Sequence, residues 1–560
     1  MWVRAAGDAA LLVQADAEPR APARVRAAIL AENFRGILDI VPGAETVLVV
    51  VEPGHPGLPE LARRLRELTH QVAAVTKAAN DVDDVSGIAG AVGAGVPVEA
   101  GGAAAGGAAA EIPVVYDGPD LGEVAEETGL SPEEVVARHA GGDYLVGWLG
   151  FSPGFGYLTG LDPALHVPRR ETPRTSVPAG SVAIAGPLAA VYPSASPGGW
   201  RLLGRTAARL WDERRDPPAA LAPGQRVRFR PVDEAGDQVD LFPPGSTARP
   251  EPEPSACGRV LEIVRPGPFA VVADLGRPGY GHLGVPRSGA ADPEHLRLAN
   301  RLVGNPEDAA AVELTLGGAV LRFSAPPGGS PAWVALTGAP APVWLEGGPG
   351  PAPADDSGLG VPFAVPAGAT LTVGPPATGV RSYLAVRGGL AVPPVLGSRS
   401  RDTLSGLGPA PLRAGDRLPV GGTGRCGPIV ADVAPAAAAM PGPAELRVVA
   451  GPRDDWFTPE ARHRLRTAVY EVTSDSNRSG LRLSGPELAR ARPGELPSEG
   501  MPLGALQVPP SGQPILFLAD HPVTGGYPVI AVVATADIGR AAQLRPGDTV
   551  RFRPVAAPAG

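Results

Sequence analysis

The chain has 560 residues, of which 44% are apolar, and this suits roughly three to five globular domains with buried cores. Its formal net charge of −9, with no basic block, excludes nucleic acid and an anionic membrane surface from the expected partners. The 75 glycines and 68 prolines exclude a mainly helical protein and favour short strands joined by tight turns.

Lysine and cysteine usage narrows the kinds of site that the chain can hold. Lys77 is the single lysine among 49 basic residues, and it lacks both the glycine loop of a P-loop and the methionine neighbours of a biotin-carrying lysine. Any phosphate would therefore be bound by arginines and backbone amides. Cys257 and Cys426 stand alone, so we expect neither a disulfide framework nor a metal site.

The sequence carries no signal for export or for a membrane. Its first residues lack the apolar core of a signal peptide. No apolar run reaches the ~20 residues of a membrane-spanning helix. We therefore expect a cytoplasmic protein.

Residues 1–78 predict a small α+β domain. The apolar runs 9–13 and 46–51 predict strands, whereas residues 22–34 and 58–74 carry apolar side chains at helical spacing. Three segments of biased composition predict linkers between successive domains; they are the Gly/Ala-rich 79–110, the Pro-rich 241–257 and the Pro/Ala-rich 434–445.

Residues 111–240 predict two helices followed by many strands. Asp120 and Ser131 each precede a glutamate by three residues, which is the spacing of a capping box. An apolar strand follows at 144–151. Residues 258–433 then predict a second β-rich domain with one helix, which Asp292 caps.

Residues 446–560 echo residues 111–240. Leu221–Val232 reappears as Leu544–Val555 with nine of twelve positions identical. Upstream, Val177-Pro-Ala-Gly180 matches Met501-Pro-Leu-Gly504. Two copies are too few for a solenoid, so we interpret the echo as a duplicated domain, each copy a closed β-barrel.

Two short motifs match a catalytic and a cofactor-binding pattern, but the residues next to them argue against these functions. Gly150-Phe-Ser-Pro-Gly154 matches a nucleophile elbow, but Pro153 follows the serine and has no N–H for an oxyanion hole. We interpret it as a loop that lines a cleft. Gly279-Tyr-Gly-His-Leu-Gly284 matches the dinucleotide fingerprint, but Pro286 follows where a helix should begin, so we predict a turn.

Candidate site residues of the first half are one histidine, two arginines and a glycine pair. His139 ends a predicted helix, where it is either a catalytic base or a residue that caps the helix. Arg170 and Arg174 could clamp a carboxylate or a phosphate, or lie on a loop surface. The pair Gly198-Gly199 precedes an aromatic residue and would let a ligand or backbone approach closely.

The last part of the chain holds a second set of candidates. Its carboxylates could act as acid and base or lie exposed, and its glycine pair again precedes an aromatic residue. The set comprises Asp454, Asp455, Arg478, Glu499, Gly525, Gly526 and Tyr527.

Longer motifs resemble a known family. Residues 111–232 resemble the B-type component of bacterial 5-oxoprolinase, whose relatives include allophanate hydrolase subunit 1 and the sporulation-kinase inhibitors. Residues 258–555 resemble the C-type component, or allophanate hydrolase subunit 2. The matching motifs include Gly150–Leu158, Ser196–Trp200, Asp274–Tyr280, Leu298–Pro306, Gly451–Asp455, Asn477–Arg482 and Thr524–Pro528. The order, B-type then C-type, resembles a gene fusion.

The resemblance implies a mainly β fold, with cyclophilin-like β-barrels in both halves and α+β elements. It implies an enzyme that uses ATP and Mg²⁺ to open the lactam ring of 5-oxoproline to glutamate. The resemblance also implies a separate A-type component as partner, and it allows a homo-oligomer. By this resemblance, the catalytic residues are His139, Asp454, Asp455 and Glu499. The other candidates named above would bind substrate or phosphate, and the family motifs add Arg277 to them.

Two alternatives stay open. The family also covers the carboxyltransferase domain of urea carboxylase, which acts on biotin. The first half alone resembles a non-catalytic inhibitor of a histidine kinase. One departure from the family is His521, which stands where many relatives carry an arginine.

Overall fold

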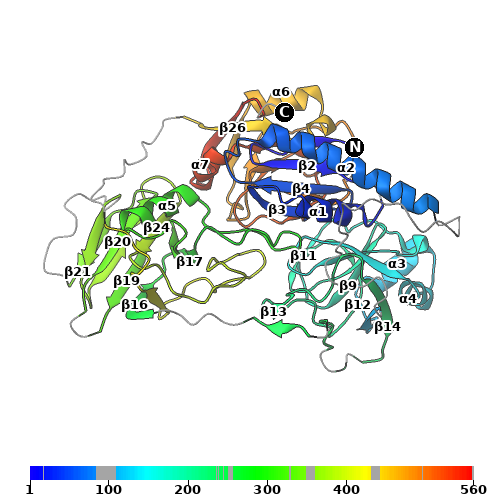
Figure 1. Ribbon diagram of the computed structural model, residues 1–560, viewed down its shortest axis with the longest axis horizontal. Helices are drawn as coiled ribbons and strands as arrows, with labels where there is room; N and C mark the ends of the chain where they lie inside the picture. The colour runs from blue at the N-terminus through cyan, green and yellow to red at the C-terminus, as the bar shows by residue number, and fades with distance from the viewer. Residues whose placement is uncertain are drawn as a thin grey trace.

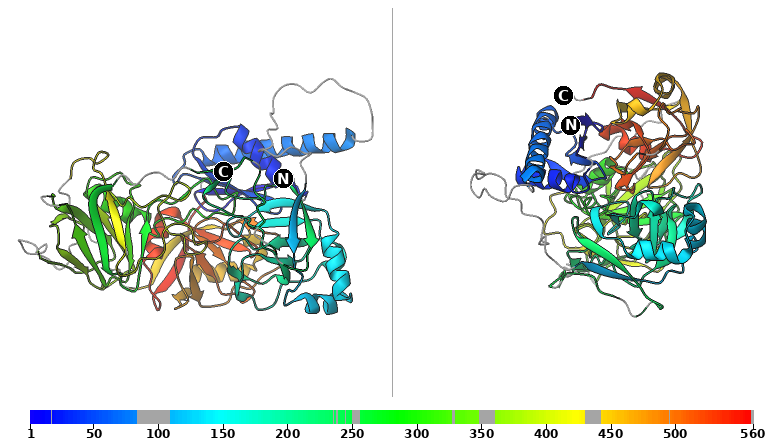
Figure 2. Two further views of the ribbon diagram at one scale, coloured as in Figure 1. Left: turned by 90° about the horizontal axis from the view of Figure 1, so that it is seen from below. Right: turned by 90° about the vertical axis from the view of Figure 1, so that its right-hand side faces the viewer.

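The computed structural model describes most of the chain as four folded parts (Figure 1). The description covers residues 1–557 except 17, 83–108, 235, 237–238, 244, 250–255, 327–328, 348–359, 430–441 and 495. Figure 2 shows the last barrel between the middle domain and the first barrel, with the N-terminal domain lying along one side.

The N-terminal domain is a four-stranded sheet with two helices. The strand order is β1-β2-β4-β3. One face packs against the helices around Val13, Val47 and Leu65. The other face carries Leu12 and Leu48, which cluster with Val523 of the last barrel. The elements are β1 (Val3–Ala5), β2 (Ala10–Gln14), α1 (Ala21–Ala31), β3 (Ile37–Pro42), β4 (Thr46–Val51) and α2 (Leu58–Val82).

The first barrel is a seven-stranded sheet that almost closes on itself. Its order is β12-β9-β10-β7-β6-β14-β5, and a single bridge between Val115 and Arg205 joins the two edges. Side chains that alternate along the strands fill the interior. The elements are β5 (Ala110–Val114), α3 (Leu121–Thr128), α4 (Pro132–Ala140), β6 (Tyr144–Leu149), β7 (Gly156–Thr159), β8 (Arg174–Val177), β9 (Ser181–Ala185), β10 (Leu188–Val191), β11 (Ser196–Gly198), β12 (Arg201–Arg205), β13 (Arg215–Asp216), β14 (Arg226–Pro231) and β15 (Thr247–Ala248).

The middle domain consists of two five-stranded sheets that share one apolar core. One sheet has the order β21-β23-β19-β16-β25, and the other β17-β18-β24-β20-β22, with α5 against its outer face. The elements are β16 (Ala256–Arg265), β17 (Phe269–Ala273), α5 (Pro293–Leu302), β18 (Ala311–Thr315), β19 (Ala319–Ser324), β20 (Ala332–Gly338), β21 (Val343–Glu346), β22 (Pro362–Val365), β23 (Thr370–Val373), β24 (Arg381–Val386) and β25 (Arg417–Gly421).

The last barrel is closed by the ring β26-β33-β30-β31-β28-β27-β34. Its first and last strands, β26 and β34, pair in parallel, as β5 and β14 do in the first barrel. The elements are β26 (Ala444–Ala450), α6 (Pro459–Thr467), β27 (Val469–Val472), β28 (Gly480–Ser484), β29 (Glu499–Gly500), β30 (Ala505–Gln507), β31 (Ile515–Phe517), β32 (Thr524–Gly525), β33 (Val529–Val533), α7 (Ile538–Ala542) and β34 (Thr549–Pro554).

The expected fold class is confirmed, because the described residues are mainly strands and form one closed and one nearly closed barrel. Two local expectations need correction. Helix α2 continues to Val82 and so enters the segment predicted as a linker, of which residues 83–108 lie outside the described part. Asp120 precedes α3 but does not cap it, because its carboxylate binds Arg174 and the Leu202 N–H. Ser131 forms the predicted capping box.

The loop Gly279–Gly284 forms the predicted turn and joins three domains. Its Gly279 and Gly281 N–H groups donate to the carboxylate of Asp39 in the N-terminal domain. Leu283 forms a β-bridge with Leu149 of the first barrel, and its carbonyl accepts from Gly154. Gly284 lies so close to the Ser152 carbonyl that a β-carbon would overlap it. The glycines therefore serve domain packing.

Candidate functional site

A large cleft of about 2010 Å³ lies where the N-terminal domain, the middle domain and the last barrel meet. Strands β3 and β4 and the turn between β1 and β2 form one wall, and the segment that leads into α5 forms another. The third wall comes from the last barrel, with residues that include His521 and Gln543. The cleft is therefore assembled from both halves of the chain.

Titratable side chains from several elements face this cleft. His295 Nδ1–H donates to the Asp292 carboxylate at 2.6 Å. Burial opposes both charges, but this hydrogen bond raises the pKa of His295 and lowers that of Asp292. Asp39 and Arg287 also line the cleft, and burial raises the pKa of Asp39 and lowers that of Arg287.

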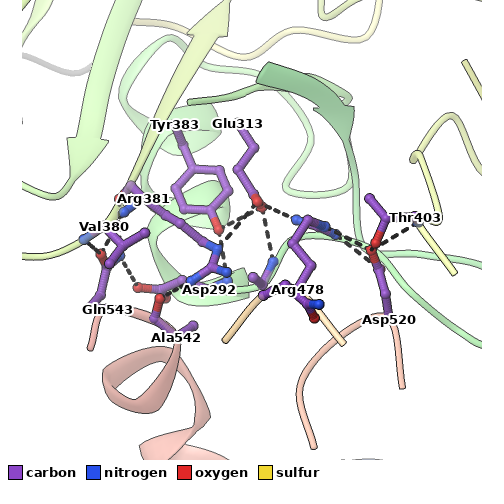
Figure 3. A network of polar contacts seen from close by, with 12 residues as sticks. Asp292, Glu313, Val380, Arg381, Tyr383, Thr403, Arg478, Asp520, Ala542 and Gln543 are labelled. Carbon is purple, nitrogen blue, oxygen red and sulfur yellow. Dashed lines mark hydrogen bonds and ion pairs between the residues drawn. The ribbon is translucent and has the colours of Figure 1, made fainter. Parts of the chain in front are cut away.

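Beside the cleft, a buried ionic network joins the middle domain to the last barrel (Figure 3). The Arg478 guanidinium donates to both oxygens of Asp520, at 2.9 and 3.1 Å, and to Glu313 of β18. Burial alone would lower the pKa of Arg478, but Asp520 and Glu313 raise it well above its usual value. Ser288 and Thr403 donate to the same Asp520 carboxylate. Each carboxylate thus has the partners that burial requires.

The network continues toward the cleft through Tyr383 and Gln543. The Tyr383 hydroxyl donates to Glu313 at 2.9 Å and accepts from the Asp292 N–H. Gln543 donates from its side-chain amide to the Asp292 carboxylate at 2.9 Å and accepts from the Arg381 N–H. Figure 3 shows this chain of contacts running from Gln543 to Asp520.

The predicted residues of the second half fall into two groups. Arg478 lies in the network, and Arg277 is buried near it, donating to the Ser400 and Val395 carbonyls. Glu499 and Asp455 instead lie against the N-terminal domain. Arg453 donates to both oxygens of Glu499, and its guanidinium stacks on Trp2 at 4.8 Å.

Asp454 and Asp455 are half-buried surface carboxylates that face different arginines. Asp455 pairs with Arg4 at 3.1 Å and with Arg492 at 3.2 Å, while Asp454 lies 3.8 Å from Arg462. The two carboxylates therefore do not converge on one point. No group of three or more His, Cys, Asp or Glu side chains suited to a metal ion occurs within the described ranges.

The glycine pair of the last barrel serves its packing. Gly525 belongs to β32, which pairs with Glu499 of β29. A β-carbon at Gly525 would meet the Gln507 amide, which donates to the Tyr527 carbonyl. The Gly526 carbonyl accepts from the Leu496 N–H, so backbone contacts fix this turn.

The two predicted arginines of the first half lie around a single buried carboxylate. Asp120 accepts from Arg170 at 2.9 Å and from both terminal nitrogens of Arg174. Burial opposes ionisation, but these hydrogen bonds lower the pKa of Asp120. Gly199 accepts from the Arg170 N–H, and a β-carbon at Gly198 would overlap the Tyr192 hydroxyl. The arginine clamp thus holds a carboxylate of the protein itself.

His139 lies in the interior of the first barrel. It is fully buried, packs on Phe229 and Tyr144, and its Nδ1 contacts the Tyr116 hydroxyl at 2.8 Å. Burial lowers its pKa to about 3. This position, outside the cleft, suits a packing role.

The loop Gly150–Gly154, which we expected to line a cleft, instead joins the two barrels. The Phe151 N–H donates to the Thr524 hydroxyl at 2.8 Å, and Phe151 has a φ of 63°. The loop is absent from the wall of the large cleft. The expectation of a cleft lining is therefore wrong for this cleft.

Sequence reasoning missed Asp39, Arg287, Asp292–His295 and Glu313 as polar groups of the central region. Arg287 stands in a Pro-Arg-Ser sequence without a recognisable motif, and Glu313 is a lone carboxylate in an apolar strand. A charged residue inside the apolar run Ala311–Thr315 was the one signal that pointed there, because such a residue needs a buried partner.

Comparison with known families defines the class of protein. The model of carboxyltransferase subdomains A and B matches residues 283–554, and that of subdomains C and D matches residues 1–221. The two matched regions include most of the residues that line the cleft. The chain is thus a carboxyltransferase-type protein whose C/D part precedes its A/B part.

The relatives narrow this class further. The chain is 37% identical over 298 residues to the C-type component of 5-oxoprolinase from Escherichia coli K12, covering 52% of this chain and 90% of the relative. It is 54% identical over 127 residues to the B-type component from Escherichia coli O157:H7, covering 22% of this chain and 58% of the relative. The chain belongs to the family of B-type and C-type 5-oxoprolinase components, and it joins the two types in one polypeptide.

Two more relatives complete the comparison. The solved structure of TTHA0988 superposes with a TM-score of 0.77 at 35% identity, over 98% of this chain and 99% of that one. Urea amidolyase of Lachancea kluyveri is 33% identical over 320 residues, which is 53% of this chain but 17% of that protein.

Within the described residues, no helix is both long and apolar enough to cross a membrane.

Proposed function

We propose that this chain is the combined B-type and C-type component of an ATP-dependent 5-oxoprolinase, which opens the lactam of 5-oxoproline to glutamate with a separate A-type component. The observation that carries the proposal is the similarity to both types, in that order, within one chain. The cleft between the two parts gives them a shared surface.

The chemistry explains why such an enzyme needs a nucleotide. An amide carbon is a poor electrophile, and transfer of the γ-phosphoryl group of ATP to the lactam oxygen converts that oxygen into a leaving group. Water then adds to the carbon and the ring C–N bond breaks, which leaves the side-chain carboxyl group as an acyl phosphate. A second water hydrolyses this acyl phosphate to glutamate and inorganic phosphate. The new charge needs arginines or Mg²⁺ nearby to offset it.

The cleft has room for such a reaction. Its volume exceeds the ~300–1,000 Å³ of a typical small-molecule site, so two reactants fit side by side. Because the described residues offer no cluster of metal ligands, Mg²⁺ would arrive bound to the nucleotide phosphates. Arg287 supplies positive charge at the wall.

A reconstitution assay tests the proposal. The purified chain is mixed with an A-type 5-oxoprolinase component, ATP, Mg²⁺ and 5-oxoproline, and glutamate and ADP are followed. We expect glutamate and ADP to form together only when all components are present. Absence of partner-dependent glutamate would refute the proposal.

A biotin-dependent carboxyltransferase is the second candidate, because both matching families are described as carboxyltransferase domains and urea amidolyase is a relative. The same preparation would then exchange a carboxyl group with free biotin. Tight binding to a histidine kinase without turnover would instead indicate an inhibitor, a role that leaves the C-type half without a purpose.

A further inference from the structure

Arg287 places its guanidinium on the wall of the cleft. Among the described residues, no carboxylate pairs with this positive charge. The Arg287 side chain makes a weak contact of 3.4 Å from Nε to the Leu275 carbonyl. Among the described residues no carboxylate forms an ion pair with it; Asp39 attracts it from a distance, and Arg297 repels it. Burial lowers its pKa, so the charge is held there at a cost.

Asp39 does not form an ion pair with Arg287 and attracts it only from a distance. Its two oxygens already accept hydrogen bonds from the backbone N–H groups of Gly279, Gly281 and Ile40. Arg26, a second arginine attracted by Asp39, also lacks an ion pair among the described residues, and its Nε is buried without a partner there. Arg26 and Arg287 are thus both attracted by one carboxylate, Asp39, with which neither forms an ion pair among the described residues.

The surroundings of Arg287 are fixed by the buried network. The neighbouring Ser288 donates its hydroxyl to Asp520 at 2.5 Å, which places the chain at Arg287 next to the chain at His521. Both residues line the cleft. His521 Nδ1–H donates to the Pro522 carbonyl at 2.9 Å, and burial lowers its pKa, so the imidazole is neutral and its Nε2 is an acceptor. His521 adds no competing positive charge.

We propose that Arg287 binds the carboxylate of a small anionic substrate at this wall of the cleft. An arginine fork matches a carboxylate with two parallel hydrogen bonds and would satisfy the guanidinium that the described residues leave without an ion pair. The inference rests on the proposed function for the identity of that substrate, 5-oxoproline, whose carboxylate stands beside the lactam. Arg287 is then a substrate-binding residue, and the lactam lies toward the open part of the cleft.

Binding to the full chain tests this site by calorimetry with three probes: 5-oxoproline, 2-pyrrolidinone (the same ring without the carboxylate) and inorganic phosphate. The wild type should bind 5-oxoproline at least tenfold more tightly than 2-pyrrolidinone. Arg287→Gln should abolish that difference and leave 2-pyrrolidinone binding unchanged, and Arg287→Lys should restore part of it. Because Arg287 has no ion pair to lose among the described residues, the melting temperature of Arg287→Gln should equal or exceed that of the wild type.

Arg297→Gln is the matched control. Arg297 lines the same cleft but is paired with Glu294 at 2.5 Å and with Glu307 at 3.5 Å, so its loss should change 5-oxoproline affinity less than threefold. The site is overturned if the wild type does not bind 5-oxoproline. It is also overturned if Arg287→Gln binds 5-oxoproline as the wild type does, or if only phosphate binding is lost.

The assembled enzyme separates this inference from the proposed function. If glutamate forms and Arg287→Gln raises KM for 5-oxoproline at least tenfold, both stand. If glutamate forms with an unchanged KM, the function stands and the carboxylate site falls. If no glutamate forms but 5-oxoproline binding still depends on Arg287, the site stands and the proposed function falls.

Discussion

The two barrels carry the same ion pair with its charges exchanged. In the first barrel the loop after β5 supplies Asp120, which binds Arg174 beside β11. In the last barrel the loop after β26 supplies Arg453, which binds Glu499 beside β32. Because β5 and β26 are the equivalent strands that pair in parallel with β14 and β34, the two pairs occupy corresponding places.

The difference shows how a duplicated fold acquires different tasks. The Asp120 pair is confined to its own domain, where it ties the loop before α3 to the two-stranded sheet of β8 and β11. The Glu499 pair faces outward to another domain, since Arg453 stacks on Trp2 and the Ser498 carbonyl accepts from Ala44. One barrel thus uses its ion pair to hold itself together, and the other uses it to bind a neighbour.

The largest expected effect concerns Arg478, which joins the last barrel to Glu313 of the middle domain. Arg478→Met leaves Glu313 and Asp520 as buried carboxylates that have lost their shared cation, so we expect a loss of about 3–5 kcal/mol in the free energy of unfolding. Urea unfolding followed by tryptophan fluorescence measures it. Arg205→Met, which removes an exposed pair with Asp117 in the first barrel, should cost less than about 1 kcal/mol. Equal losses would contradict the conclusion that the buried pair between two domains contributes more than the exposed pair within one barrel.

The exchanged ion pairs predict opposite responses to pH. The pKa of Asp120 is lowered, so its ionisation contributes stability above the ordinary aspartate pKa, which is lost as the pH falls. Asp120→Asn should therefore cost about 1.5–3 kcal/mol at pH 7 and less near pH 3. The pKa of Glu499 is raised by burial, so the stability that this side chain contributes is present at low pH and is lost as the pH rises. Glu499→Gln should thus become less costly toward pH 7. The measurement is the difference in melting temperature between each variant and the wild type, followed from pH 3 to pH 8. If this difference changes with pH in the same direction for both variants, the opposite pKa shifts of Asp120 and Glu499 are refuted.

His139 allows a direct comparison of barrel interiors. In α4 the buried residues are Val135 and His139, and in α6 they are Ala461 and Leu465, with the same spacing. His139→Leu should therefore change stability at pH 7 by less than about 1.5 kcal/mol. Since the pKa of His139 is about 3, the wild type loses stability as the pH falls below the ordinary histidine value, and the variant should lose less. A large fall in glutamate formation with unchanged folding would instead assign His139 to catalysis.

The contact between the barrels carries the smallest expected effect. Thr524→Val removes the hydroxyl that accepts from the Phe151 N–H while keeping the side-chain shape. We expect a loss of about 1 kcal/mol in unfolding free energy. Thr549→Val, at a half-buried position of strand β34 in the same barrel, is the control and should cost less. Hydrogen exchange at the Phe151 amide should rise in the first variant alone.

The sequence predicts local structure well where the cause is local. The repeated Leu-x-Pro-Gly turn located both barrels, and Ser131 with Glu134 formed the predicted capping box. Asp120 has the same spacing but serves another purpose, because its partners Arg174 and Leu202 come from more than fifty residues later in the chain. Arg287 escaped notice for a related reason: its significance depends on which carboxylates lie near it, and only the assembled domains decide that.

The loop Gly279–Gly284 forms an interface between the two halves of the chain like one between separate subunits. The loop belongs to the C-type half, yet it binds Asp39 and the Gly150–Gly154 loop of the B-type half, mostly through backbone groups. Such an interface does not depend on covalent continuity. Cleavage within residues 241–257 should therefore yield two polypeptides that copurify as a stoichiometric pair, and the fused chain is then a tethered heterodimer whose tether sets the local concentration of its halves.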